Sequence, residues 1–235
     1  KKLLTECQNF VKVQNKLFSE QLAPFFESND FKIVKVDDLT DAELKKASSF
    51  FDKTIFPMLT PMVYDNYHTF PILMNKLLIF SVVTRNHGDK KENKKLSFIQ
   101  MPQNIQRFFE IHRDDKIFFL PIEELVRSNI DKLFRNIEIL SVNMFRITRN
   151  GDFTLEESDD IEANFLEEMR KKLKTRKTGR VVRIEIDKDY DKWMMKILSD
   201  RWEIDKDNIF KFDENTLLDY GALWQVIKHN EFKDK

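Results

Sequence analysis

The side chains in this sequence that are best suited to catalysis or metal binding are four histidines, at positions 68, 87, 112 and 229. A histidine can act as a nucleophile toward phosphate or bind a metal, but either role needs a group that orients the ring and further cations or ligands. No HxxxH or CxxC spacing occurs, and Cys7 is the single cysteine. We therefore expect no metal site and assign no catalytic residue. His87 and His229 are interpreted as solvated, His112 as part of a charged turn over residues 111–115, and His68 as a packing residue.

Glycine is too sparse for a phosphate-binding loop. The chain has four glycines, Gly88, Gly151, Gly179 and Gly221, and no two of them are close together. A loop that cradles phosphate needs several glycines within a few residues, because the backbone must approach the anion closely. The sequence therefore excludes a P-loop and a dinucleotide-binding fingerprint.

Cationic side chains are the remaining candidates for anion binding. Residues 170–177 (RKKLKTRK) form the densest basic run, which could attract a polyanion, but we favour the solvated face and last turn of a helix. On the predicted strand over residues 137–148, Arg146 faces away from the core and Arg149 falls in the core-side register. Arg149 could emerge to bind an anion, but pairing with Asp152 or Glu156 is the commoner outcome.

The elements that must position these groups alternate between helices and strands. A first helix is predicted over residues 3–26, with Pro24 bending or ending it. A second begins at a capping box at residues 40–43, carries Ile55 and ends before Pro57. Further helices are predicted over residues 121–133, 160–178, 191–203 and 217–228. Strands are predicted over residues 31–36, 77–84, 96–101, 117–120, 137–148, 180–187 and 209–212, with a hairpin loop over 85–95 and a turn at Asn150-Gly151. The strand at 137–148 should place residues 137, 139, 141, 143, 145 and 147 on one face. The fold class is α+β, with a mixed, mostly antiparallel sheet flanked by helices.

Composition narrows the class of protein. The net charge is zero, from 40 basic and 40 acidic residues, which disfavours a general nucleic-acid binder. The 22 phenylalanines argue against disorder. No apolar run approaches the length of a membrane span, and one cysteine fits a reducing cytoplasm. The chain opens with Lys-Lys directly into a helical pattern, which indicates a start inside a longer protein.

Several strings, in this order, resemble bacterial polyphosphate kinases. They are residues 56–62 (FPMLTPM), 70–71 with 75–77 (FP and NKL), Pro102 with 107–108 (RF), 119–126 (FLPIEELV), 145–150 (FRITRN), and 176–179 with 182–185 (RKTG and VRIE). Leu77 and Gly151 depart from the family pattern, which has Ser and Ala there, and Arg135-Asn136 stands where Pro-Gly is common. The resemblance implies that residues 1–35 end the helical N domain and that residues 36–235 form the head, or middle, domain.

The resemblance also implies a function for the parent protein. Such enzymes move the terminal phosphate of ATP reversibly onto polyphosphate through a phosphohistidine, with ATP and Mg²⁺ as cofactors. They are cytoplasmic homo-oligomers, either dimers or tetramers, and peripheral association with a membrane is left open. Their catalytic residues belong to domains that would follow residue 235, so this piece should be inactive alone and serve assembly. Arg107, Arg146 and Arg149 are the candidates for contact with polyphosphate.

Two other functions remain open from the residues themselves. A non-enzymatic protein-interaction module would fit the abundant phenylalanine and the missing catalytic motifs. A nucleic-acid binder that uses residues 170–177 would fit the basic run, but the neutral charge and the lack of an aromatic-rich basic strand disfavour it.

Overall fold

The computed structural model describes residues 2–65, 67–88, 93–150, 179–212 and 217–232. Its helices are α1 (Lys2–Leu17), α2 (Ala23–Ser28), α3 (Asp41–Phe50), α4 (Ile122–Ser128), α6 (Lys192–Trp202) and α7 (Leu223–Ile227). Its strands are β1 (Phe31–Ile33), β2 (Met62–Tyr64), β3 (Leu78–Asn86), β4 (Lys95–Gln100), β5 (Phe108–Arg113), β6 (Lys116–Pro121), β7 (Ile137–Arg149), β8 (Val181–Asp187) and β9 (Ile209–Phe212). The helices and mixed sheets confirm the predicted α+β class.

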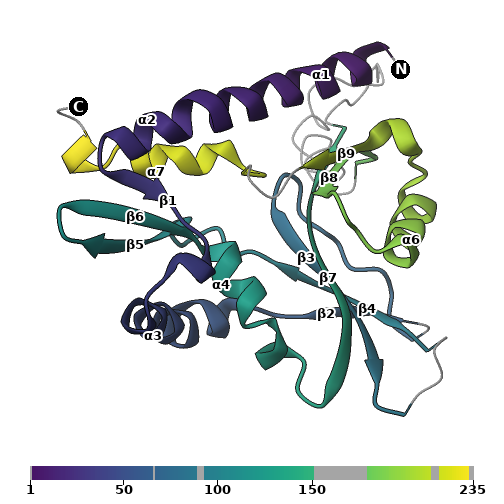
Figure 1. Cartoon of the computed structure of the whole chain (residues 1–235). Coiled ribbons are helices and arrows are strands. Elements are labelled where there is room, and N and C mark those ends of the chain that lie inside the picture. The colour runs from purple at the N-terminus through teal and green to yellow at the C-terminus, as the bar shows by residue number, and fades with distance from the viewer. Residues whose placement is uncertain (1, 66, 89–92, 151–178, 213–216, 233–235) are drawn as a thin grey trace, which may run out of the picture.

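The described strands form two sheets. The larger has the order β2-β4-β3-β7-β8-β9 and is antiparallel except where β9 lies parallel to β8. The smaller has the order β1-β6-β5, with β1 parallel to β6 and β5 antiparallel to it. Because β1 follows α2 directly, the N-terminal helical segment is tied into the same body as the rest of the chain (Figure 1).

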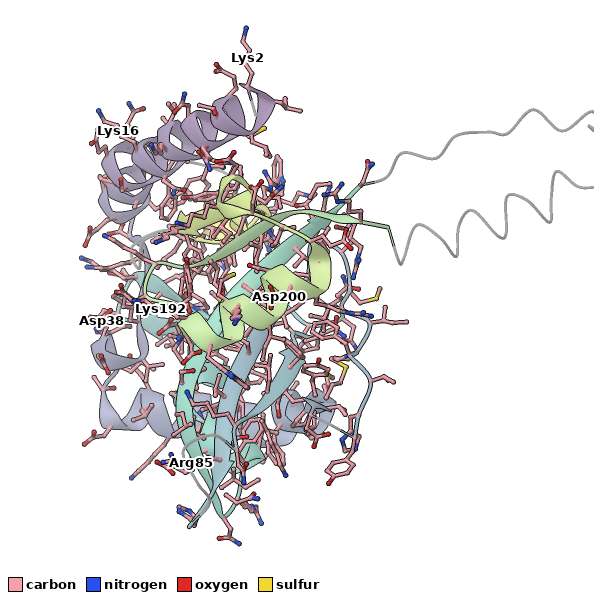
Figure 2. All side chains as sticks on the ribbon, turned by 90° about the vertical axis from the view of Figure 1, so that its right-hand side faces the viewer. Lys2, Lys16, Asp38, Arg85, Lys192 and Asp200 are labelled. Atoms are coloured by element: carbon pink, nitrogen blue, oxygen red, sulfur yellow. The ribbon has the colours of Figure 1, made fainter. Side chains whose placement is uncertain are left out.

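The larger sheet carries a hydrophobic core on each face. On one face, Phe80 and Val82 of β3 pack with α3, α4 and the smaller sheet. On the other, Phe145 and Ile147 of β7 pack with Met194 and its neighbours on α6. Figure 2 shows α6, marked by Lys192 and Asp200, lying across the second face. Successive side chains of a strand point to opposite faces of the sheet, so the central strands contribute residues to both cores. This is why β3 is apolar over most of its length.

A β-bulge corrects the predicted face of the long strand. Val83 pairs with Ser141 and Thr84 pairs with Ile139, so Leu140 is the extra residue. Residues 137 and 139 therefore pack on the opposite core from residues 145 and 147. A single inserted residue reverses every later side chain because the strand period is two.

Other predicted elements differ in their bounds. The first helix continues past Pro24 to Ser28, because a π-helical turn at Phe18–Leu22 precedes it and Pro24 lies in the first turn of α2, where no donor is needed. The capping box is confirmed, with the Thr40 amide donating to Glu43 Oε2 at 2.8 Å. His112 lies on β5, not in a turn, since the turn begins at Asp114.

Some shorter elements were not predicted, and others were predicted to be longer than they are. β2 and β5 were not predicted, β1 ends at Ile33, and α7 begins at Leu223 after a 3₁₀ turn at Tyr220–Ala222. Two predictions fall outside the described residues: the helix over 160–178, which contains the basic run, and Gly151 of the turn at 150–151. None of the described helices is long and apolar enough to cross a bilayer.

Candidate functional site

Helix α1 crosses the body of the molecule without burying any residue of its own (Figure 1). It is held at its C-terminal end by the buried Phe18 of the following π turn, whose ring lies 5.2 Å from that of Tyr220. Along its length, the Tyr220 hydroxyl donates to Asn15 Oδ1 at 2.8 Å and Gln8 Nε2 donates to the Asp207 carbonyl at 3.3 Å. Burial raises the pKa of Tyr220 to about 12, so this donor keeps its proton. The helix is therefore attached at separated points with open space beneath it.

The space beneath α1 is a hollow of about 1380 Å³, which we call the α1 trough. Its roof is the polar face of α1, and its floor and walls come from β1, α4, β7, β8, β9 and the residues that join them. A second cavity of about 200 Å³ adjoins it and shares Val11, Asn15 and Lys211 with it. Strands and helices far apart in the sequence thus meet around one concave surface.

The trough is lined by seven cations and five carboxylates. The cations are Lys12, Lys16, Lys32, Lys35, Arg127, Lys188 and Lys211. The carboxylates are Glu27, Glu123, Glu124, Asp187 and Asp189. The whole chain is neutral, so the trough has a local positive excess that composition alone does not reveal.

Several of the carboxylates are already neutralised by neighbours. Glu27 pairs with Lys32 at 2.7 Å, and Asp187 accepts from Arg127 at 3.2 Å and from the Met144 amide at 2.6 Å. Burial raises the pKa of the Glu124 carboxyl, against the influence of the cations around it. These pairs also take up Lys32 and Arg127, so any positive excess comes from the other lysines of the lining.

Arg107, the first predicted contact, forms a buried ion pair on the floor. Its Nη2 donates to Glu123 Oε1 at 2.7 Å, and the Glu123 side chain is 8% exposed. Burial raises the pKa of Glu123, while Arg107 opposes that effect. Glu123 lines the trough, and Arg107 is not among the lining residues. Arg107 is therefore connected to the trough only by its contact with Glu123.

Arg146, the second predicted contact, lines the smaller cavity. Its guanidinium is bidentate with Glu185, at 2.9 Å from Nε and 2.8 Å from Nη2, and its Nη1 lies 3.7 Å from Asp219. Glu185 is itself buried. Arg146 makes that burial tolerable, because a buried carboxylate needs a hydrogen-bonded cation.

Arg149, the third predicted contact, is the last residue of β7, three positions after Arg146. Its Nη1 donates to the Gly179 carbonyl at 2.7 Å and its Nη2 to the Leu73 carbonyl at 3.2 Å. Burial lowers the pKa of this guanidinium. Its backbone amide donates to Asn75 Oδ1 at 2.9 Å, so two separate sequence strings, at 75–77 and 145–150, meet here. The suggested partners Asp152 and Glu156 lie outside the described residues.

The structure therefore separates the three arginines and adds residues that sequence reasoning missed. Arg146 and the partner of Arg107 reach the connected cavities, whereas Arg149 does not line either one. The missed residues are the lysines of α1 and of the opposite wall. The spacing of Gln8, Lys12, Asn15 and Lys16 on one helical face was the available signal, since positions three and four apart share a face. Within the described residues, no group of three or more His, Cys, Asp or Glu could hold a metal ion.

The described chain is thus an α+β domain with a polar, cation-rich trough suited to an anionic ligand. It belongs to the polyphosphate kinase family, since the family model for the polyphosphate kinase middle domain matches residues 42–226.

Similar proteins agree with this assignment. The chain is 34% identical over 203 residues to a polyphosphate kinase of Halalkalibacterium halodurans, covering 85% of this chain and 28% of that protein. It is 31% identical over 214 residues to one of Mycolicibacterium gilvum, covering 89% and 28%. The crystal structure of polyphosphate kinase from Porphyromonas gingivalis has the same fold, with a TM-score of 0.68 at 16% identity over 92% of this chain and 31% of that one. The chain spans less than a third of the length of these relatives.

Proposed function

We propose that this chain is the head domain of a cytoplasmic polyphosphate kinase, and that the parent enzyme reversibly transfers the terminal phosphate of ATP to polyphosphate through a phosphohistidine. The match of residues 42–226 to the middle domain of the family carries the proposal. ATP and Mg²⁺ would bind to the parent outside this chain. The division into residues 1–35, from the end of the N domain, and 36–235, the head domain, is part of the same proposal.

The chain alone is proposed to be inactive in phosphoryl transfer. The support comes from the sequence, whose four glycines are too scattered for a phosphate loop. Among the described histidines, His68 Nδ1 lies 2.7 Å from Asp65 Oδ1 in an exposed loop, and His229 packs edge-on against Phe31 and Phe119. The interpretation of His68 as a packing residue was wrong, since its side chain is 63% exposed. The interpretation of His229 as solvated was also wrong, since its side chain is only 16% exposed.

The proposed role of the domain is assembly of a homo-oligomer together with contact to polyphosphate. The outward face of α1 exposes the apolar side chains Leu3, Phe10, Val13 and Leu17, between 45% and 75% exposed. An apolar stripe of this kind marks an interaction surface. Arg146 is the strongest of the three arginine candidates for polyphosphate, because it alone lines a cavity; Arg107 and Arg149 stay predictions.

A protein-interaction module without enzymatic activity is the second candidate, and the same exposed stripe favours it. The test compares the full-length gene product with this chain, using γ-labelled ATP. We expect the full-length protein to incorporate label on a histidine and to form acid-insoluble polyphosphate, and this chain to do neither. A full-length protein without either activity would refute the kinase proposal, and a labelled histidine in this chain would refute the division of roles.

A further inference from the structure

We propose that α1 is a hinged roof, which swings on the π turn at Phe18–Leu22 between the closed position of this structure and an open position that uncovers the trough. The inference concerns the motion of this chain and does not depend on the assignment of its parent as a kinase. The observation that carries it is an abrupt change of packing at Phe18, within one continuous helical segment that leads into α2 and β1 (Figure 1).

The packing of the segment differs on the two sides of Phe18. Helix α1 has 16 residues and buries none of them. Within the part of the chain that the structure describes, none of the three hydrophobic cores includes an α1 side chain. Phe18, Phe26 of α2 and Phe31 of β1 are at most 5% exposed and share one core. Because burial of an apolar face holds a helix in place, α2 and β1 are fixed to the body and α1 is not.

The backbone is weakened at the point where the packing changes. In the π turn, the Ala23 amide donates to the Phe18 carbonyl, five residues earlier. Just before it, the Ser19 hydroxyl donates to the Lys16 carbonyl at 3.3 Å. Just after it, Pro24 has no amide hydrogen to donate. Helices bend at π turns and prolines, since fewer regular backbone bonds resist the change there. The turn is therefore a suitable hinge.

Two side-chain hydrogen bonds act as latches that keep α1 closed. The Tyr220 hydroxyl donates to Asn15 Oδ1 at 2.8 Å, and Gln8 Nε2 donates to the Asp207 carbonyl at 3.3 Å. Each such bond contributes little net free energy, because water replaces it when it breaks. The Tyr220 ring also lies 5.2 Å from that of Phe18. This ring contact is at the pivot, so it can persist while the latches open.

Opening of the roof changes access to the trough. Glu6 precedes Phe18 by twelve residues, about 18 Å of helix, so a rotation of about 20° moves that end of α1 by about 6 Å. Val11 and Lys12 line the trough from above and move with the helix. A hinge of a few residues beside a cavity is a common way to admit and enclose a ligand. We therefore assign α1 the role of a lid on the trough.

Distances between spin labels on the 235-residue chain, measured by double electron–electron resonance, test the hinge. Cys7→Ser removes the single native cysteine. The arm pair is Glu6→Cys/Asp200→Cys, which joins the free end of α1 to α6. The body pair, Lys45→Cys/Asp200→Cys, joins α3 to α6 and is the matched control, since all these positions are exposed. We expect the body pair to give one distance and the arm pair to give a closed distance and a second, displaced one.

Removal of the latches should shift this equilibrium. Tyr220→Phe deletes the latch hydroxyl and keeps the ring, and Gln8→Ala deletes the other donor. Together they should raise the ratio of displaced to closed arm at least about five-fold. Ser128→Ala removes a hydrogen bond to the Leu125 carbonyl on α4 and should leave the ratio within about two-fold.

The proposal is overturned if the arm pair keeps one closed distance after both latches are removed. It is also overturned if Ser128→Ala shifts the ratio as much as the latch variant does, or if the body pair spreads as widely as the arm pair. Thermal unfolding of each labelled variant checks that the body stays folded. Phosphoryl transfer by the full-length protein is measured separately, so a rigid α1 refutes the hinge and leaves the kinase assignment standing.

Discussion

Breaking the buried Arg107–Glu123 pair is the sharpest test of how this domain is stabilised. The Arg107 side chain is 19% exposed and that of Glu123 is 8% exposed, with 2.7 Å between Nη2 and Oε1. Replacement of Glu123 by leucine leaves the guanidinium buried opposite an apolar side chain. The loss of one partner from a buried pair costs about 3–5 kcal/mol of unfolding free energy.

The same geometry predicts that removing both charges is cheap. Glu123 Oε2 and Arg107 Nε are buried and have no hydrogen-bond partner among the described residues, so the pair is imperfectly compensated. Replacing a buried pair with apolar side chains of similar volume is often neutral or stabilising. Arg107→Met/Glu123→Leu should therefore recover most of the stability that Glu123→Leu loses.

Urea and thermal unfolding of the single and double variants give the measurement. For a chain of this size, the single variant should lower the midpoint by roughly 6–20 °C. Glu27→Leu, which breaks the exposed pair with Lys32, is the control and should cost less than about 1 kcal/mol. If Glu123→Leu and Glu27→Leu cost the same, or if the double variant is as unstable as the single one, the reasoning on desolvation is wrong.

Three further predictions follow from individual contacts. Arg113 holds the pKa of Glu43 at about 2 instead of 4.5, so the folded state binds this proton more weakly than the unfolded chain. The resulting stabilisation is complete above pH 4.5 and is lost as the pH falls toward 2. Arg113→Gln should reduce that acid dependence of stability in urea titrations, and an unchanged dependence would refute the pairing. Arg149→Ala removes two charged donors from backbone carbonyls and should cost about 1–3 kcal/mol in chemical unfolding, a value near zero arguing against this anchoring. Gln225→Ala leaves the Phe108 amide and carbonyl at the β5 edge without their side-chain partner, and should speed hydrogen exchange at that amide while an amide on β3 serves as the unaffected reference; equal exchange would contradict this role.

Local sequence rules predicted the larger elements well. A continuous apolar run identified β3, apolar alternation identified β7 and β8, and the Thr40–Glu43 capping box identified the start of α3. They failed where the deciding interaction comes from elsewhere in the chain. β2 has three residues and is defined by its pairing with β4, and β5 by its pairing with β6. With three residues, β2 is too short for a periodic signal.

The candidate site was less predictable than the fold. The arginine strings drew attention to Arg107, Arg146 and Arg149, but their partners lie 16 to 76 positions away in the chain. The lysines of the trough carry no motif, because each is an ordinary surface cation in its own segment. Apart from the shared helical face of Lys12 and Lys16, their meeting around one hollow is what distinguishes them.

The sequence by itself determined the α+β class, the family strings and the absence of a glycine-rich phosphate loop, because each depends on residue type and short spacing. The tertiary structure decided which face each half of β7 presents, since the bulge at Leu140 is defined only by pairing with β3. It also decided which charges are neutralised and which remain to attract a ligand. Electrostatic interactions act through space, so charge along the chain does not reveal where a field is concentrated.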